Sequence, residues 1–240
     1  MMESVNGFFK ISAMLMALTA IGCQAKQAPT QVVYRFDDHR FLELTGYDCE
    51  GALWYTDSQR GIHSQITSQF FRIFTKTYIH PSEQYIAIPN WDTGHDGVSV
   101  SKDYGQTWQS VRPSPGPNEP DGMDSAPQDD VISFTVVNDQ GFLLTKKSLY
   151  MSSKPFEDPR VQPGGPGIPH TLQDGQVQVI KPGSDGWKWG MVYSTKRGLV
   201  DTVQILKTNW QGLPDKVPEV NNYKGWDHMR CDMNAGKENE

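Results

Sequence analysis

Short apolar runs recur along the chain from residue 31 onward, and Gly, Pro, Asn or Asp separates one run from the next. The runs are rich in Val, Ile, Tyr, Phe, Trp and Thr, which favour β-strands. No window after residue 23 has the 3.6-residue period of a long amphipathic helix. We therefore predict strands at residues 31–36, 52–56, 70–79, 84–88, 98–101, 107–111, 131–137, 142–145, 148–152, 177–180, 188–193 and 203–208.

The spacing of these runs predicts an all-β, antiparallel fold. A degenerate β-propeller fits the length, since about 40–45 residues per blade leaves room for roughly four or five blades. A β-sandwich is the alternative. Residues 138–141 (NDQG) are expected to form a hairpin turn, because Asn, Asp and Gly tolerate a positive φ.

Two Pro-rich segments interrupt the pattern, at residues 113–130 and 159–169, and neither is expected to form regular structure. The first has no Lys or Arg. An acidic loop of this kind is usually just solvated, but exposed loops also carry function. Its acidic residues are therefore candidates for binding a basic partner: Glu119, Asp121, Asp124, Asp129 and Asp130.

The N-terminus has the pattern of a lipoprotein signal peptide. Residues 11–21 (ISAMLMALTAI) are apolar apart from Ser12 and Thr19, and they are shorter than the roughly 20 residues needed to span a bilayer. The following Gly22-Cys23 resembles the end of a bacterial lipobox, which makes Cys23 the expected lipid anchor. A plain secretory signal and a retained helix are the alternatives.

This interpretation divides the chain into a signal peptide at residues 1–22, a lipidated tether at 23–30, one all-β domain at 31–236 and a polar tail at 237–240. Gln24 follows the cysteine, and by resemblance to other lipoproteins this favours anchoring in the inner leaflet of the outer membrane. Export also bears on the two other cysteines, Cys49 and Cys231, because cysteines usually pair in an oxidising compartment. Two buried free thiols are the alternative to this disulfide.

The charge balance excludes some classes of function. With 22 Lys+Arg against 28 Asp+Glu, the formal net charge is −6, whereas phosphate recognition requires a cationic surface. We therefore expect no nucleic-acid partner. The single long apolar run excludes a polytopic membrane protein.

The most specific internal motif is residues 101–108 (SKDYGQTW), which resembles the Asp-box found on hairpins of propeller proteins such as sialidases. Its expected role is structural. Asp103 can accept hydrogen bonds from backbone N–H groups of the turn, and Gly105 supplies a positive φ. Trp108 is expected to anchor the following strand in the core. The matching positions are Ser101, Asp103, Gly105, Thr107 and Trp108.

No nucleophile elbow, zinc-protease, CxxC, P-loop or dinucleotide-binding motif is found in the sequence. Asp92 and Asp96 could hold a cation, but the segment lacks the ligand spacing of an EF-hand loop, so a turn capped by carboxylates is favoured. We expect no catalytic residues, no bound metal and no cofactor.

The sequence resembles the type VI secretion immunity lipoproteins that neutralise antibacterial phospholipase effectors. The resemblance rests on the lipobox at Cys23, the residues 101–108, and the segments at residues 46–57, 72–81, 133–139 and 225–232. It implies a non-enzymatic periplasmic protein that binds and inhibits a cognate phospholipase. It transfers no individual binding residue. The alternatives are a glycan-binding or glycan-processing propeller lipoprotein, and a purely structural lipoprotein of the cell envelope.

Overall fold

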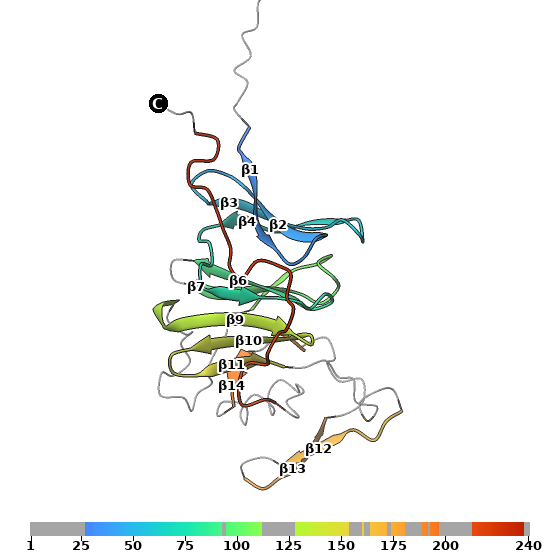
Figure 1. Ribbon diagram of the computed structural model, residues 1–240. Helices are drawn as coiled ribbons and strands as arrows, with labels where there is room; N and C mark the ends of the chain where they lie inside the picture. The colour runs from blue at the N-terminus through green and yellow to red at the C-terminus, as the bar shows by residue number, and fades with distance from the viewer. Residues whose placement is uncertain are drawn as a thin grey trace, which may run out of the picture.

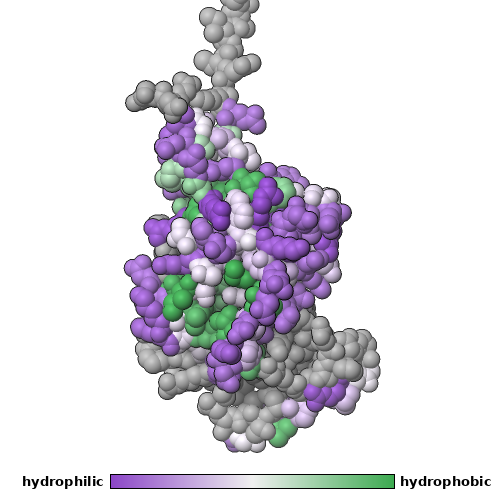
Figure 2. Space-filling view, viewed as in Figure 1, coloured by the Kyte–Doolittle hydropathy of each residue, from purple (hydrophilic) through white to green (hydrophobic). Residues whose placement is uncertain are grey.

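The computed structural model describes residues 27–92, 95–111, 128–153, 160, 164–171, 174–180, 189–191, 193–196 and 213–237. These residues form β-strands and no α-helix, which confirms the all-β prediction. The strands make four sheets, antiparallel except for one pair, and the larger sheets follow one another along the molecule (Figure 1). Seen from the same side, the described surface is mostly hydrophilic, with smaller apolar patches (Figure 2). Within the described residues, no helix has the length and apolar character needed to cross a membrane.

The first sheet is a meander of four consecutive strands: β1 (Thr30–Arg35), β2 (Arg40–Thr45), β3 (Gly51–Asp57) and β4 (Ile62–Phe70). Its faces differ because side chains alternate along each strand. Leu42 lies opposite Tyr55, and both are fully buried. Glu43 lies opposite Trp54, and both are partly exposed. One face therefore packs on the core and the other faces away from it.

Three further sheets follow the first. One contains β6 (Ile86–Asp92), β7 (His95–Ser101) and β8 (Gln109–Val111), in that order. A five-stranded sheet has the order β14-β11-β10-β9-β5, formed by β5 (Thr77–Ile79), β9 (Val131–Val137), β10 (Gln140–Thr145), β11 (Leu149–Ser152) and β14 (Tyr193–Thr195). The smallest sheet pairs β12 (Ile168–Thr171) with β13 (Val177–Ile180). A short 3-10 helix, η1 (Gln128–Asp130), precedes β9, and β5 pairs with β9 in parallel.

The core is rich in tyrosine, and several of the buried hydroxyl groups make hydrogen bonds, although that of Tyr55 has no partner among the described residues. Tyr34 donates to the carbonyl of Tyr78 (2.8 Å), and Tyr78 donates to that of Ala87 (2.7 Å). The hydroxyl groups of Tyr85 and Tyr193 share a hydrogen bond of 2.7 Å. Burying a phenol costs little free energy when its hydroxyl is hydrogen-bonded, so these four rings add buried apolar area without leaving a donor unpaired.

An irregular C-terminal segment, residues 213–237, runs along the sheets and is drawn in red in Figure 1; we call it the C-terminal strap. The N–H groups of Trp226 and Arg230 donate to the carbonyls of Arg35 and Val33, each at 2.8 Å. The strap therefore covers the edge of β1 as an additional strand would. Met229 of the strap is buried.

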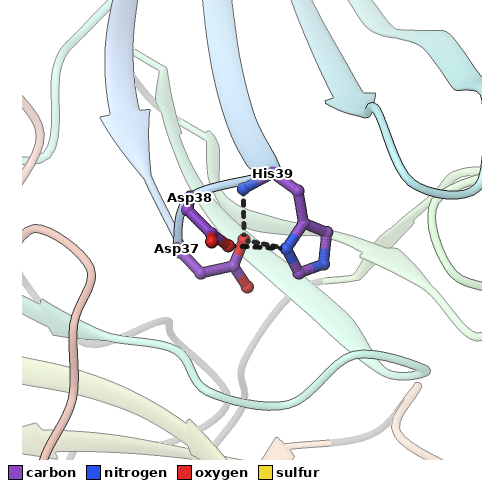
Figure 3. A group of neighbouring side chains, drawn as sticks. All are labelled: Asp37, Asp38 and His39. Atoms are coloured by element: carbon purple, nitrogen blue, oxygen red, sulfur yellow. Dashed lines mark hydrogen bonds and ion pairs between the residues drawn. The ribbon is translucent and has the colours of Figure 1, made fainter.

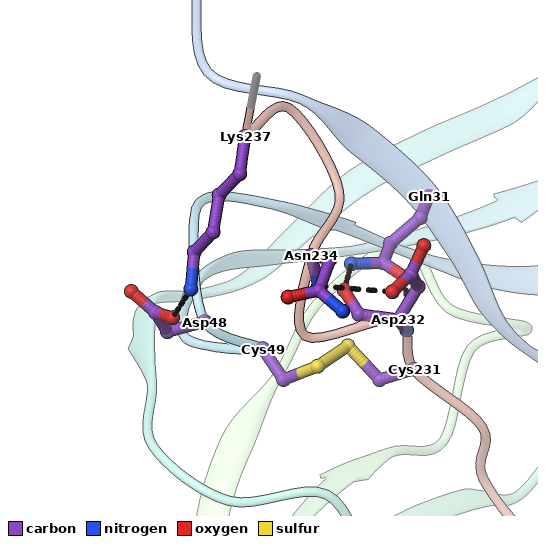
Figure 4. Close-up of a disulfide and its surroundings, with 7 residues drawn as sticks. All are labelled: Gln31, Asp48, Cys49, Cys231, Asp232, Asn234 and Lys237. Atoms are coloured by element: carbon purple, nitrogen blue, oxygen red, sulfur yellow. Dashed lines mark hydrogen bonds and ion pairs between the residues drawn. A yellow bond between two sulfur atoms is a disulfide. The ribbon is translucent and has the colours of Figure 1, made fainter. Parts of the chain in front are cut away.

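A disulfide between Cys49 and Cys231 fastens the end of the strap to the turn between β2 and β3 (Figure 4). The two Cα atoms are 6.0 Å apart, within the range usual for a disulfide. Beside the bridge, Gln31 and Asp232 exchange two hydrogen bonds, of 3.2 and 2.8 Å, and Lys237 pairs with Asp48. The structure thus contains the pairing expected from the cysteine count.

Several predicted strand boundaries were wrong. Residues 70–79 are not one strand, because β4 ends at Phe70 and β5 begins at Thr77 in a different sheet. Of residues 188–193, only Tyr193 lies in a described strand, while Trp189 and Gly190 form a turn. β12 starts inside the Pro-rich segment 159–169, where no regular structure was expected, and η1 does the same in segment 113–130. The predicted strand 203–208 lies outside the described residues.

Two strands of the first sheet and one of the smallest were missed: β2, β4 and β12. The sequence of β4, IHSQITSQF, is mostly polar because it is an edge strand with much of its surface exposed. In β2, a buried Arg40 and a partly exposed Glu43 interrupt the apolar run. β12 contains a Pro, which is tolerated because the sheet has only two strands and both are edges. Polar strands of this kind carry little signal in composition alone.

Candidate partner-binding surface

Turns from distant parts of the chain meet at one end of the first sheet. We call this surface the turn face and define it as residues 37–40, 57–61, 81–84, 102–107 and 138–139. It contains an open, polar pocket of about 380 Å³. The pocket is lined by Arg60, Pro81, Ser82, Glu83, Gln84, Tyr104, Val137, Asn138 and Asp139.

Arg60, in the turn between β3 and β4, is fixed by two carboxylates. Its guanidinium donates to Asp57 (2.9 Å) and to Glu83 (2.6 Å), and it lies over the ring of Tyr104, with the centroid 4.5 Å away. Burial acts to raise the pKa of Asp57, but hydrogen bonds from the backbone and side chain of Arg60, and the charge of Arg60, outweigh it and leave that pKa below its usual value. The hydrogen bonds that Arg60 donates to these carboxylates raise the pKa of Arg60. The three groups form a preorganised charged cluster.

Tyr104 is placed by the turn between β7 and β8, which Asp103 holds together. The Asp103 carboxylate accepts hydrogen bonds from the backbone N–H groups of Gln106 (3.1 Å) and Thr107 (2.9 Å) and from the Thr107 hydroxyl (2.6 Å). Burial acts to raise the pKa of Asp103, but these bonds, led by those from Thr107, leave it below its usual value. Tyr104 itself has φ = 62°, a left-handed conformation that is uncommon for an aromatic residue.

The same turn packs against the first sheet. Ser101 accepts a hydrogen bond from the N–H of Gly105 (2.8 Å), and Gly105 has φ = 89°. A Cβ on Gly105 would lie 2.3 Å from the ring of Tyr55, so only glycine fits. Trp108 stands just before β8, is partly exposed, and donates from its indole N–H to the hydroxyl of Ser64 (2.9 Å). Trp108 therefore packs at the margin of the core, less deeply than expected from the sequence.

The turn between β9 and β10 closes the other side of the pocket. Asn138 and Asp139 both have φ = 53°, as in a two-residue hairpin turn. The Asp139 carboxylate accepts from the N–H of Tyr85 (3.2 Å), and the Asp139 N–H donates to the hydroxyl of Ser82 (3.0 Å). The turn expected at residues 138–141 is thus present, with its two positive-φ residues at Asn138 and Asp139.

Arg40 supports the turn face from below. Its side chain is 2% exposed and donates to the Asp37 carboxylate (2.6 Å) and to the carbonyls of Ser82 (2.6 Å) and Pro81 (3.3 Å). These bonds tie the turn between β1 and β2 to residues 81–82. A buried guanidinium is stable only when such acceptors surround it, so Arg40 acts here as a structural cross-link.

Within the described residues, one group of side chains could hold a metal ion: Asp37, Asp38 and His39 (Figure 3). Their possible ligand atoms lie within 4.8 Å of one another. The His39 Nδ1 lies 2.9 Å from Asp38 and 3.1 Å from Asp37. Asp37 already accepts the N–H groups of His39 (3.1 Å) and Arg40 (2.7 Å). The arrangement is that of a turn capped by carboxylates.

The turn face is more acidic than the rest of the chain. It has six acidic and three basic residues, a net charge of 3 − 6 = −3 with His39 neutral, which is half of the −6 of the whole chain. The acidic members are Asp37, Asp38, Asp57, Glu83, Asp103 and Asp139, and the basic members are Arg40, Arg60 and Lys102.

Two of the three basic side chains of the turn face are withdrawn from solvent. Arg40 is buried, and the Lys102 ammonium is shielded from solvent and lies 5.5 Å from the centroid of the Trp189 ring. Burial lowers the pKa of Lys102. Among the described residues of the turn face, Arg60 is therefore the basic side chain left near the surface.

Of the predicted partner-binding residues, the two that the structure describes, Asp129 and Asp130, lie away from this surface. Asp129 and Asp130 lie in η1, at the opposite end of the β9–β10 hairpin from the turn at Asn138. Asp130 has lysine neighbours, Lys146 at 3.5 Å and Lys147 at 3.9 Å. The acidic segment contains no Lys or Arg of its own, but at Asp130 lysines from elsewhere in the chain supply a counter-charge. Four other predicted residues lie outside the described residues: Cys23, Glu119, Asp121 and Asp124.

Sequence reasoning missed Arg60, Glu83, Tyr104 and Asp139 as members of one site. The spacing of Asp57 and Arg60 is a weak local signal for an ion pair across a turn. The meeting of four turns depends on how the sheets pack, which no local pattern in the sequence records. Asp92 and Asp96, considered above as cation ligands, occupy strands β6 and β7, and their side chains lie outside the described residues.

The chain matches a known protein family. A family model described as "T6SS Tli3 immunity protein" matches residues 26–146, which is half of the 240-residue chain. The matched part extends from β1 to the end of β10 and includes every residue of the turn face. The C-terminal strap lies beyond it. No curated protein matches the chain.

Proposed function

Because the chain belongs to the Tli3 family of type VI secretion system immunity proteins, we propose that it binds and inhibits an antibacterial phospholipase effector in the periplasm and thereby protects the cell that makes it. The observation that carries this proposal is the family match over residues 26–146. The family implies a cognate effector as partner. That this effector is a phospholipase rests on the sequence resemblance described above.

The site of action is proposed from the N-terminal sequence and the cysteines. A lipoprotein signal at residues 1–22 would export the chain, and acylation of Cys23 would hold it at the outer membrane, where several acyl chains make anchoring stable. The Cys49–Cys231 bridge supports export, since disulfides persist mainly in oxidising compartments. Membrane attachment would keep the inhibitor close to the lipids that the effector attacks.

The geometry supports a binding role for the turn face. The N–H of Gly46 donates to the carbonyl of Pro29 (3.0 Å), so the start of β1 and the turn after β2 lie at the same end of the first sheet. The turn face lies at the other end of these strands, around Arg40 and Asp57. A tether ending at residue 30 would therefore leave the turn face directed away from the membrane and open to an incoming protein.

We also propose that the chain is non-catalytic, and that its sheets are blades of one degenerate propeller domain. Blades are antiparallel meanders of consecutive strands, and both β1–β4 and β6–β8 have this form. An experimental structure in which the sheets surround a common axis would support this arrangement. Two sheets packed face to face would support the β-sandwich instead.

The function is tested by expressing a candidate phospholipase effector, with a signal for export to the periplasm, in cells that carry or lack this protein. We expect growth arrest without the protein and normal growth with it. A pull-down of the two purified proteins should give a stoichiometric complex. Growth arrest in both strains, together with the absence of a complex, would refute the proposal.

A further inference from the structure

We propose that the pocket of the turn face receives a lysine or arginine side chain from a basic segment of the effector. This inference rests on the proposed function, because it identifies the surface and the partner chemistry of the same binding event. It follows from the shape of the pocket, from the carboxylates around it and from how firmly its lining is held.

The chemistry of the lining favours a cation. Glu83 spends one carboxylate oxygen on Arg60, and Asp139 spends one on the N–H of Tyr85. The second oxygen of each makes no hydrogen bond within the described residues, and both residues line the pocket. Arg60 is already matched by Asp57 and Glu83. An incoming ammonium or guanidinium would find free carboxylate oxygens here, and such charge-assisted hydrogen bonds are among the stronger ones.

The size and polarity of the pocket favour a protein side chain over a small molecule. Small-molecule sites usually have about 300–1,000 Å³ and are lined mostly by apolar groups. This pocket is near the lower limit of that range, at about 380 Å³, and it is open and mainly polar. It can therefore surround the end of one long side chain while the turns around it contact the partner surface.

The pocket is organised before any partner arrives. Tyr104 is held with φ = 62° by the Asp103 turn, and its backbone N–H donates to the carbonyl of Gln84 (3.2 Å). Arg60 is clamped between this ring and two carboxylates. Because these side chains are already ordered, binding would cost little conformational entropy. Arginine and tyrosine are also the residue types that most often dominate binding energy in interfaces.

The net charge of the turn face also favours a basic partner. A net charge of −3 on the turn face attracts a basic protein surface and speeds its approach, while it repels the anionic surface of a membrane. The effector is therefore the occupant for which we argue, and a lipid headgroup is disfavoured.

The test compares three substitutions in the mature protein. Binding of a purified candidate phospholipase effector to each variant is measured by calorimetry at low and at physiological salt. Glu83→Gln removes a pocket charge and should weaken binding roughly tenfold. Asn138→Asp keeps a residue that tolerates the positive φ and adds a charge, so it should strengthen binding roughly threefold. Glu50→Gln is the matched control, since it removes an exposed charge at the other end of the first sheet, and it should leave affinity within about twofold.

The opposite signs separate electrostatics from damage to the fold, because a disturbed fold would not strengthen binding. The effects should also shrink as salt is raised. Equal binding by all three variants and the wild type, or weaker binding by Asn138→Asp, would overturn the pocket proposal and leave the immunity function standing. Failure of the wild-type protein to bind the phospholipase would overturn both.

Discussion

The Cys49–Cys231 bridge should contribute several kcal/mol to the stability of the mature protein. It closes a loop of 182 residues in the unfolded chain. In the chain-entropy model a loop of this length corresponds to about 5 kcal/mol, and strain or residual structure in the denatured state reduces the measured value to about 2–5 kcal/mol. The native fold should survive without the bridge. The strap retains its hydrogen bonds from Trp226 and Arg230 to β1 and its buried Met229.

The assay is urea unfolding of a chain that begins at Gln24, so that the only thiols are those of the bridge. Tryptophan fluorescence would follow unfolding with and without a reductant. Cys49→Ser and Cys231→Ser should each lower the free energy of unfolding to the value of the reduced wild type, and the double variant should not respond to reductant. Equal stability of the oxidised and reduced wild type would refute the argument. A variant that is destabilised to the same extent under both conditions, relative to the wild type in that condition, would also refute it.

Three other predictions concern the core, the Asp103 turn and the anchor. Gly105→Ala should lower the free energy of unfolding by about 3 kcal/mol, because the residue has a positive φ and its new Cβ would lie 2.3 Å from the Tyr55 ring. Gly61→Ala is the control, since Gly61 has φ = 66° but nothing within 4 Å of the added Cβ, and it should cost about 1 kcal/mol in the same thermal unfolding assay. Equal costs for the two variants would contradict the packing described. Burial, and then the charge of Arg40, lower the pKa of His80 in the folded protein. As the pH falls below about 6.5, the imidazole is therefore protonated in the unfolded state before it is protonated in the folded state. The free energy of unfolding should fall by at most about 1.4 kcal/mol per pH unit in this range. His80→Gln keeps an acceptor for the N–H of Ala87 and should reduce the loss of unfolding free energy between pH 7 and 5, as measured by denaturant titrations. An unchanged dependence on pH would count against a buried neutral imidazole. Cys23→Ala should move the protein from the membrane fraction to the soluble periplasmic fraction, and continued membrane retention would argue against lipidation.

Much of the fold class was predictable because strand-forming residues and turn residues alternate so regularly. The runs at residues 31–36, 52–56 and 131–137 predicted β1, β3 and β9 to within a residue at each end. These strands have a buried face, and burial demands apolar side chains. β4 was not predicted because an exposed edge strand does not need apolar side chains, and its polar sequence therefore resembles that of a loop.

The candidate site was far less accessible to sequence reasoning. The role of Asp103 in its turn is local and could be predicted from the residues around it. The pocket depends on Arg60, Glu83, Tyr104 and Asp139, which come from separate turns, so it exists only once three sheets have packed. Composition instead drew attention to the acidic segment at residues 113–130. There, the lysines near Asp130 come from the turn after β10 and are distant in the sequence.

The function that we propose for this protein is inhibition of a phospholipase by direct binding. The most direct measurement is the hydrolysis of phospholipid vesicles by the purified effector as the mature protein is titrated in. If the protein inhibits the effector by binding it, hydrolysis falls to the background level at a 1:1 molar ratio and the two proteins elute as one complex. Undiminished hydrolysis at a large molar excess of this protein, with the two proteins eluting separately, would contradict it.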